Sequence, residues 1–238
     1  MAASLERSPL LYARWGGIAY LAIIALGMFG ELAVRSALVV SVDPGATMRA
    51  IAASEGLWRA GIAGDLLMQA LDIPVMVALY YLLNPVSKSL ALLATGFNLI
   101  QTAVLVANKM ALVVPLLLLS KAAYMTAFSP EQLHTLAYLA IKAHNFGFGV
   151  GLIFFGLACL VRGYLLLKAP YFPKVFGYLM LAAGACYLIN SFALLLAPAF
   201  AGLLFPLVLL PPFVAELAFA LWLSVKGVNL PQWEQSTR

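Results

Sequence analysis

Two acids and an amide lie close together in a strongly apolar part of the chain, the stretch GDLLMQALDIP at 64–74. Asp65, Gln69 and Asp72 are spaced at i, i+4 and i+7, and this spacing places them on one face of a helix. Carboxylates in an apolar helix can exchange protons, pair with cations or bind a polar ligand, and they are costly otherwise. This helix face is therefore our first candidate site.

The overall composition explains why such a helix face stands out. The 238 residues are 64% hydrophobic and 10% charged, and the mean hydropathy is +1.00. Soluble domains carry about 25% charged residues, and the apolar runs exceed the roughly 18 residues that cross a bilayer. We therefore predict an all-α, polytopic membrane helical bundle. In such a chain the net charge of +5 reflects loops that set orientation and does not indicate nucleic-acid binding.

Helix breakers divide the apolar runs into six predicted spans. Pro44, Pro85, Pro173 and Pro198 fall between runs, where proline commonly ends a helix. We expect one membrane domain over residues 1–238. Its predicted spans cover about 13–38, 58–83, 88–118, 143–167, 174–197 and 202–226.

Two connecting segments are expected to form short helices at the membrane surface. Residues 46–57 mix small, apolar and charged side chains. Ser129 followed by Pro130 is typical of a capped helix start, and the second surface helix would cover 130–141. A continuous helix from 130 to 167 is the alternative.

Positive charges are unequal on the two sides of the predicted bundle. Six spans place both termini on one side of the membrane, which we call the terminal side. This side carries eight Lys and Arg residues, Arg162 among them, and the other side carries five. An excess of positive charge marks the cytoplasmic side. We therefore predict a multi-pass protein of the bacterial cell (inner) membrane with both termini in the cytoplasm.

Most polar side chains of the spans fall in their outer halves, whereas the inner halves of the last three spans are expected to be plain hydrocarbon. Such polar residues usually face a cavity or a partner. We therefore predict a polar pocket toward the outer side, with a floor around Asp72, Gln101 and Glu216. The candidate residues for binding a ligand or a proton are Glu31, Arg35, Asp65, Gln69, Asp72, Gln101, Asn108, Lys109, His144, Asn190 and Glu216.

These residues also have structural explanations. Glu31 and Arg35 are spaced at i, i+4 and can neutralise each other. Lys109 can pair with Asp65 or Asp72 across helices. The candidate set nevertheless holds four acids against two bases, and buried ion pairs are rarely a net gain in stability.

Prolines accompany the two deepest acids. Pro74 lies in the second predicted span, and Pro206, Pro211 and Pro212 lie in the sixth, which they are expected to interrupt. Broken helices at membrane depth are tolerated where they line protein or a water-filled cavity. Ordinary kinks are the alternative.

Motifs of familiar enzyme classes are absent from the sequence. It contains no GxSxG elbow, phosphate-binding loop or glycine-rich dinucleotide loop. The two histidines have no metal-binding spacing, so we expect no metal or other cofactor and name no catalytic residue. Cys159 and Cys186 fall inside spans and indicate buried thiols rather than a disulfide.

Several stretches carry a resemblance to a known family. They are GIAYLAIIALGMFGELAVRSALVV (17–40), AASEGLWRAGIAGDLLMQALDIPVMVALYYLLNPVSKSLALLATGFNLIQ (52–101), the series from SPEQL to GLIFFGLACLVRGYLL (129–166), YFPKVFGYLMLAAGACYLINSFA (171–193) and ELAFALWLSVKGVN (216–229). The chain resembles an uncharacterised bacterial integral membrane family, domain of unknown function 4386. The resemblance implies a polytopic bacterial membrane protein and no established activity.

Three kinds of function remain open. The leading hypothesis is a polar pocket that binds a small or lipid-like ligand, and in the ion-coupled transport version of this hypothesis Asp72 or Glu216 titrates as the ligand moves. The alternatives are a membrane enzyme on a lipid head group, with His144 or Asp65 as general acid or base, and a structural or accessory subunit. Membrane lipids and a small-molecule or lipid ligand are the expected partners, with a homo-oligomer or larger membrane complex left open.

Overall fold

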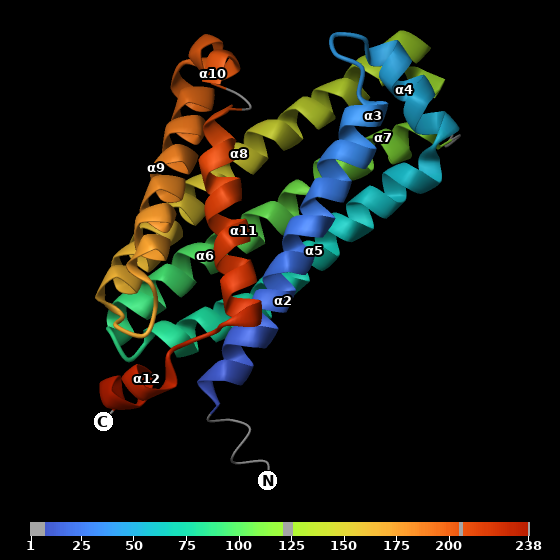
Figure 1. Cartoon of the computed structure of the whole chain (residues 1–238). Helices are drawn as coiled ribbons and strands as arrows, with labels where there is room; N and C mark the ends of the chain where they lie inside the picture. The colour runs from blue at the N-terminus through green and yellow to red at the C-terminus, as the bar shows by residue number, and fades with distance from the viewer. Residues whose placement is uncertain (1–7, 121–125, 205–206, 238) are drawn as a thin grey trace.

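The computed structural model describes residues 8–120, 126–204 and 207–237, and every regular element in these ranges is helical (Figure 1). Six stretches of helix in the described chain are long and apolar enough to cross a membrane. The prediction of an all-α membrane bundle is therefore confirmed. We call the end of the bundle where α2 begins and α12 ends the terminal end, and the other the distal end (Figure 1).

Some spans are built from more than one helical element. The first span passes from α-helix through a π-helix, and the third is divided into two elements at Lys109. In chain order the elements are α2 (Pro9–Met28), the π-helix η1 (Phe29–Arg35), α3 (Ser36–Leu38), α4 (Pro44–Ala53), α5 (Glu55–Leu83), α6 (Lys88–Asn108), α7 (Met110–Leu119), α8 (Pro130–Lys168), α9 (Lys174–Leu196), α10 (Pro198–Leu204), the 3-10 helix η3 (Leu207–Leu209), α11 (Leu210–Val225) and α12 (Leu230–Ser236).

One of the two expected surface helices does not exist as a separate element. Residues 130–141 are the beginning of α8, which continues unbroken for 39 residues, so the alternative of one long helix is correct. Its start is the predicted one, because the Ser129 hydroxyl and the Gln132 side chain form a reciprocal capping box. The other surface helix is α4, which ends before Ser54.

The prolines near the sixth span begin a helix and do not interrupt one. Pro211 and Pro212 lie in the first turn of α11, where a missing backbone N–H costs no hydrogen bond. The expected interruption is thus a boundary between α10 and α11. Pro206 lies outside the described residues. Pro74 is inside the continuous helix α5.

The helix α9 packs closely against the terminal half of α8. A Cβ atom on Gly184 would lie 2.7 Å from the carbonyl oxygen of Gly156, and one on Gly177 would lie 2.9 Å from that of Gly163. Small residues at such crossings let membrane helices approach closely. These glycines therefore fix α9 against the terminal half of α8.

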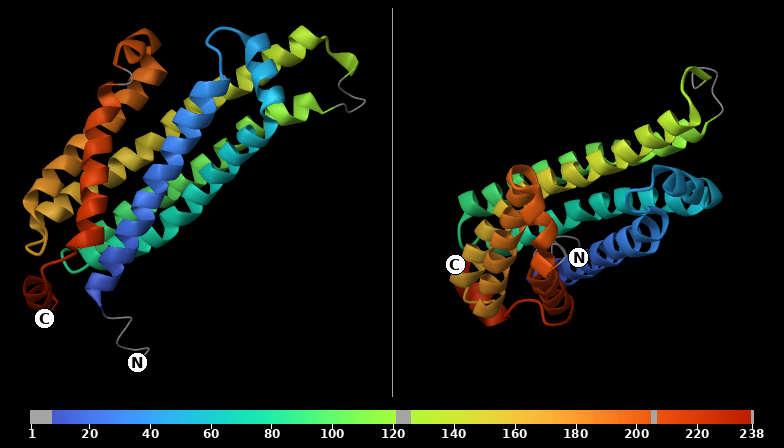
Figure 2. Two further views of the ribbon diagram at one scale, coloured as in Figure 1. Left: turned by 45° about the vertical axis from the view of Figure 1, so that its right-hand side comes forward. Right: turned by 90° about the horizontal axis from the view of Figure 1, so that it is seen from above.

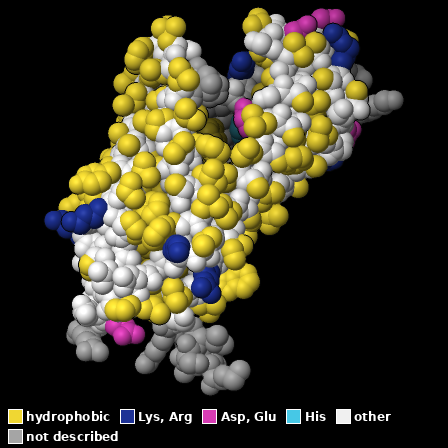
Figure 3. Space-filling view, in the orientation of Figure 1, with side chains coloured by type: hydrophobic (Ala, Val, Ile, Leu, Met, Phe, Trp, Pro, Cys, Tyr) yellow, Lys and Arg dark blue, Asp and Glu magenta, His cyan; other side chains and the backbone are white. Residues whose placement is uncertain are grey.

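The bundle divides into two arms that meet toward the terminal end and diverge distally (Figures 1 and 2). One arm consists of α9, α10 and α11, and the other holds α2 to α4 with the distal parts of α5 and α8. Figure 3 shows a notch between the arms at the distal end, where acidic and histidine side chains are visible.

Two hydrophobic cores are separated by polar residues. Along α5, Trp58 and Ile62 belong to a distal core, whereas Val75 and Leu79 belong to a larger core toward the terminal end. The stretch 65–72 lies between them. The fold thus places the first candidate helix face where neither core fills the bundle.

Candidate functional site

The candidate residues gather in two clusters rather than in one continuous group. The Asp65 cluster lies toward the distal end, and the Glu216 cluster lies deeper, where the two arms meet. The Asp65 cluster comprises Glu31, Arg35, Asp65, Asn108, Lys109 and His144. The Glu216 cluster comprises Tyr20, Asp72, Asn98, Gln101, Thr102, Arg162, Tyr187 and Glu216.

Two cations converge on one oxygen of Asp65. Arg35 Nη1 lies 2.7 Å and Lys109 Nζ 2.9 Å from Asp65 Oδ2. Arg35 also contacts Glu31, with 2.8 Å between Nε and Oε2. The carboxyl of Asp65 is fully buried, whereas the side chain of Glu31 is 56% exposed. Two acids and two bases are thus in direct contact, and their charges cancel.

Both of these cations sit at irregular points of their helices. Arg35 ends the π-helix η1, a rare conformation that is frequent at functional sites. Lys109 lies between α6 and α7, and its backbone N–H is shared between the carbonyls of Leu105 and Val106, at 3.2 Å each. The convergence on Asp65 therefore depends on local departures from regular helix geometry.

Glycine makes room for this cluster. A Cβ atom on Gly30 would lie 2.6 Å from Asp65 Oδ1 and 3.0 Å from Arg35 Nη2. On the opposite side, Lys109 Nζ lies 3.2 Å from His144 Nε2. Asn108 donates a 2.8 Å hydrogen bond to the backbone carbonyl of His144 and thereby ties α6 to α8.

In the second cluster, Glu216 is held by two tyrosines. Tyr20 donates its hydroxyl to Glu216 Oε2 at 2.8 Å, and Tyr187 donates to Oε1. Tyr20 comes from α2 and Tyr187 from α9, so one carboxylate joins three helices. Both donors are neutral, in contrast to the partners of Asp65.

Asp72 is also surrounded by neutral donors. The Asn98 amide donates to Asp72 Oδ2 at 2.7 Å, and the Thr102 hydroxyl donates to the same oxygen. Asn98 further donates to Gln101 Oε1 at 2.8 Å. Of the residues expected as the floor of a pocket, Asp72 and Gln101 are therefore joined through Asn98, whereas Glu216 interacts with Asp72 only electrostatically.

Arg162 is the base of this cluster, and its predicted position was wrong. It was assigned to the terminal side of the membrane, but it is 4% exposed inside the bundle and donates to Asn98 Oδ1. It interacts electrostatically with both Asp72 and Glu216, without direct ion-pair contact to either. The available signal was its position inside the fourth predicted span, 143–167, which ends next to the exposed Lys168.

The tyrosines of the Glu216 cluster were missed because tyrosine is unremarkable in an apolar segment. Their position was the available signal. Aromatic residues of membrane proteins concentrate at the ends of spans, whereas Tyr20 and Tyr187 are in the interiors of α2 and α9. A hydroxyl at that depth needs a partner within the bundle.

Other polar atoms of the described chain lack such a partner. Asp65 Oδ1, Gln69 Oε1 and Ser191 Oγ are buried and have no hydrogen bond to any described residue. Gln69 lies between Asp65 and Asp72 on α5. Asn190, next to Ser191, is partly buried and joins neither cluster. Buried polar groups without partners are uncommon and call for water or a ligand.

An enclosed pocket at these residues stays a prediction. Two open hollows of the described chain lie at the terminal end, away from these residues. The described residues also contain no group of three or more His, Cys, Asp or Glu side chains arranged to hold a metal ion. Cys159 and Cys186 are free thiols.

A comparison with known families identifies the chain. A family model described as domain of unknown function DUF4386 matches residues 16–227, a range that contains both clusters. The chain belongs to this family. A protein of Archaeoglobus fulgidus, described as uncharacterized, is 30% identical over 172 residues, covering 72% of this chain and 86% of the relative. No solved structure matches. The family resemblance is confirmed, whereas a bacterial origin stays a prediction because this relative is archaeal.

Proposed function

We propose that this multi-pass membrane protein binds a small or lipid-like ligand at the Glu216 cluster and couples its movement to a proton or another monovalent cation. The observation that carries the proposal is the charge of the cluster. Asp72 and Glu216 share the single base Arg162, so two ionised acids leave one negative charge unbalanced. An unbalanced charge inside a membrane protein is costly and is typical of a site that takes up a cation.

The hydrogen bonds around Glu216 suit reversible protonation. Tyr20 and Tyr187 reach it through hydroxyl groups, and a hydroxyl can donate to a carboxylate or turn to accept from a carboxylic acid. The acid can therefore gain or lose a proton without a change in the backbone. The N–H groups of an amide or a guanidinium in the same place could donate to the carboxylate but could not accept the proton of a carboxylic acid.

The buried polar atoms without partners support a route from the distal side. Gln69 Oε1 lies along α5 between the clusters, and Ser191 Oγ lies on α9 in the other arm. We infer that water molecules or polar ligand atoms bond these two buried atoms. Entry of the ligand from the side of the notch is part of this proposal, as is the predicted outward-facing pocket.

The predicted orientation belongs to the same proposal. With Arg162 inside the bundle, the excess of positive charge on the terminal side falls by one and keeps its sign. Exposed cations remain there, including Lys88, Lys168, Lys174 and Lys226. We infer a cell-membrane protein whose termini face the cytoplasm.

An enzymatic role for Asp65 has less support. Arg35 and Lys109 both bind the same carboxylate oxygen of Asp65. A general base would have to break these contacts before it could act.

The proposal is tested by following protonation directly. The full-length protein in lipid nanodiscs is subjected to a pH jump, and infrared difference spectra report the carbonyl stretch of protonated carboxylic acids. We expect a band that disappears in Glu216→Gln or Asp72→Asn and persists in the control Glu55→Gln. Glu55 is a suitable control because it forms a surface pair with Arg59, 2.7 Å from Nη2 to Oε1.

Proteoliposomes with an internal pH-sensitive dye provide the functional readout. We expect an imposed pH gradient to collapse faster with wild-type protein than in empty liposomes, and both variants to lose this flux. Unchanged flux in both variants, or no titrating band in the spectra of the wild type, would refute the proposal.

A further inference from the structure

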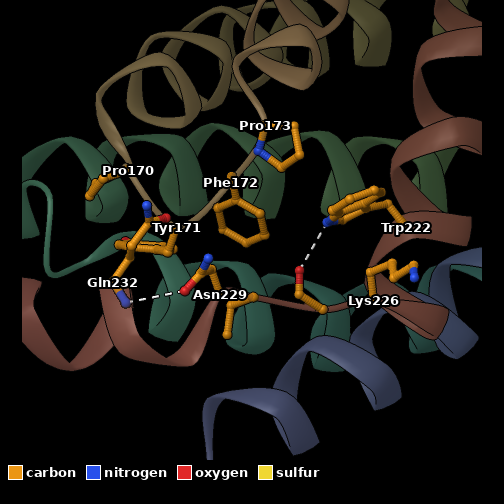
Figure 4. A pocket seen from close by; sticks show the side chains of 10 residues that line it. Pro170, Tyr171, Phe172, Pro173, Trp222, Lys226, Asn229 and Gln232 are labelled. Carbon is orange, nitrogen blue, oxygen red and sulfur yellow. Dashed lines mark hydrogen bonds between the residues drawn. The ribbon is translucent and has the colours of Figure 1, made fainter.

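A pocket at the terminal end is separate from both clusters. It has a volume of about 380 Å³ and lies between the loop that joins α8 to α9, the end of α11 and the start of α12. Figure 4 shows Phe172 near its middle, with Trp222 and Lys226 on one side and Asn229 and Gln232 on the other. Aromatic, basic and amide side chains thus share one small site.

The chain reversal after α11 fixes the shape of this pocket. Gly227 has a φ of +70°, a conformation that favours glycine, and its carbonyl accepts a 3.0 Å hydrogen bond from Trp222 Nε1. The Asn229 N–H donates to the Tyr171 carbonyl at 3.2 Å. Trp233 of α12 is buried with its ring edge against Tyr171, 4.8 Å between ring centroids. The walls are therefore held in place without a ligand.

The charge around the pocket is positive. Lys226 lines it, and Lys174 begins α9 directly after the lining residue Pro173. Lys168 ends α8 just before the same loop, and all three lysines are exposed. The described lining residues include no acid. Basic pockets between membrane helices are suited to anionic lipid head groups.

The edge of the pocket is apolar on the side of the spans. Val175 and Tyr178 of α9 and Val225 of α11 are all exposed next to it along the chain. Phe176 and Trp222 pack together there, with 5.4 Å between ring centroids, and join the two helices. A polar site bordered by exposed apolar helix faces matches the two-part chemistry of a phospholipid.

We propose that this pocket binds the phosphate-bearing head group of an anionic phospholipid. The ammonium groups of Lys174 and Lys226 pair with the phosphate, and the amides of Asn229 and Gln232 bond the polar head group. The acyl chains lie along the exposed faces of α9 and α11. This site is independent of ligand binding at the Glu216 cluster.

Native mass spectrometry of the delipidated full-length protein tests the proposal. Phosphatidylglycerol and phosphatidylcholine with identical acyl chains are titrated in separate experiments. We expect phosphatidylglycerol to bind more tightly, and the double variant Lys174→Gln/Lys226→Gln to weaken it by about five-fold per lysine. Binding of phosphatidylcholine should not change. Lys88→Gln is the matched control, because Lys88 is exposed at the start of α6 and does not line the pocket.

Three outcomes would overturn the proposal. The first is equal affinity for the two lipids, and the second is an equal loss in the Lys88→Gln variant. The third comes from adding inorganic phosphate alone. We expect added phosphate to leave phosphatidylglycerol binding unchanged. If inorganic phosphate instead binds as tightly as the lipid, the site is one for a free anion. Because both lysines are exposed, unfolding of the double variant should match that of the wild type.

Discussion

The Asp65 and Glu216 clusters bury acid in two different ways. In the Asp65 cluster, Arg35 and Lys109 contact the carboxylate directly and the charges cancel. In the Glu216 cluster, neutral hydroxyl and amide donors surround the acids, which share Arg162 at longer range. Direct, balanced pairs are suited to holding helices together, whereas an acid with neutral donors and excess charge is suited to exchange. We propose that this difference separates a structural polar cluster from a functional one.

The largest expected effect is at the balanced cluster. Asp65→Asn removes the buried carboxylate that Arg35 and Lys109 share, so we expect the free energy of unfolding to fall by about 3–5 kcal/mol. Detergent-titration unfolding of the purified protein measures this change. Glu31→Gln is the control, because Glu31 is largely exposed and should cost less than about 1 kcal/mol. Equal losses in the two variants would contradict the central place of Asp65.

A pair of tyrosines sharpens the comparison. Tyr20→Phe removes a hydrogen bond to Glu216 and is expected to cost about 1.5–3 kcal/mol if the acceptor is ionised. Tyr171→Phe removes a 2.8 Å hydrogen bond to the neutral Leu82 carbonyl and should cost about 0.5–1.5 kcal/mol. Burial raises the pKa of the Tyr171 phenol, so it remains a donor at neutral pH.

The same unfolding titration measures both tyrosine variants. We expect the larger loss for Tyr20→Phe. Equal losses would mean that Glu216 already carries a proton in the resting protein, and the charges of Asp72 and Arg162 would then balance.

Gly30 tests the packing of the Asp65 cluster without removing any charge. In Gly30→Ala the new methyl group meets Asp65 and Arg35, so we expect a loss of about 1–3 kcal/mol. Gly96→Ala in α6 is the matched control, because a Cβ atom there meets nothing within 4 Å. The control should be neutral or more stable by up to about 1 kcal/mol. If Gly30→Ala leaves the free energy of unfolding unchanged, the side chains of this cluster can shift to make room for a methyl group.

The smallest effect on stability is expected at Glu216. Glu216→Gln keeps an oxygen that accepts from a tyrosine and removes the unbalanced charge, so we expect a loss of less than about 1.5 kcal/mol. The same unfolding titration checks this value. A loss as large as that of Asp65→Asn would make both clusters structural and would remove the contrast between them.

The sequence predicted the helices better than their interactions. The spans follow from apolar run length, and the start of α8 follows from its capping residues. The failures have specific causes. Arg162 was counted with the charges of the terminal side because it lies near the end of the fourth predicted span, whereas its side chain is buried in the bundle. Pro211 and Pro212 were expected to break a helix and instead begin α11, because proline fits both places.

Most of the candidate residues do interact with one another, but their division into two clusters could not be predicted from the sequence. Asp65 and Asp72 share a helix face, yet one joins Arg35 and Lys109 while the other joins Asn98 and Thr102. Their partners lie on other helices, and the order of helices along the chain does not determine which side chains of different helices face each other.

The sequence by itself determined that most of this chain lies in lipid and that its backbone must be helical there. Apolar length sets the first, and the need to satisfy backbone hydrogen bonds without water sets the second. Only the tertiary structure decided which acids are neutralised. Helix rotation, the π-helix at Arg35 and the break at Lys109 aim both cations at Asp65. The same packing leaves Asp72 and Glu216 to share one base. Charge pairing depends on distances between helices, and these distances cannot be derived from the spacing of residues along one helix.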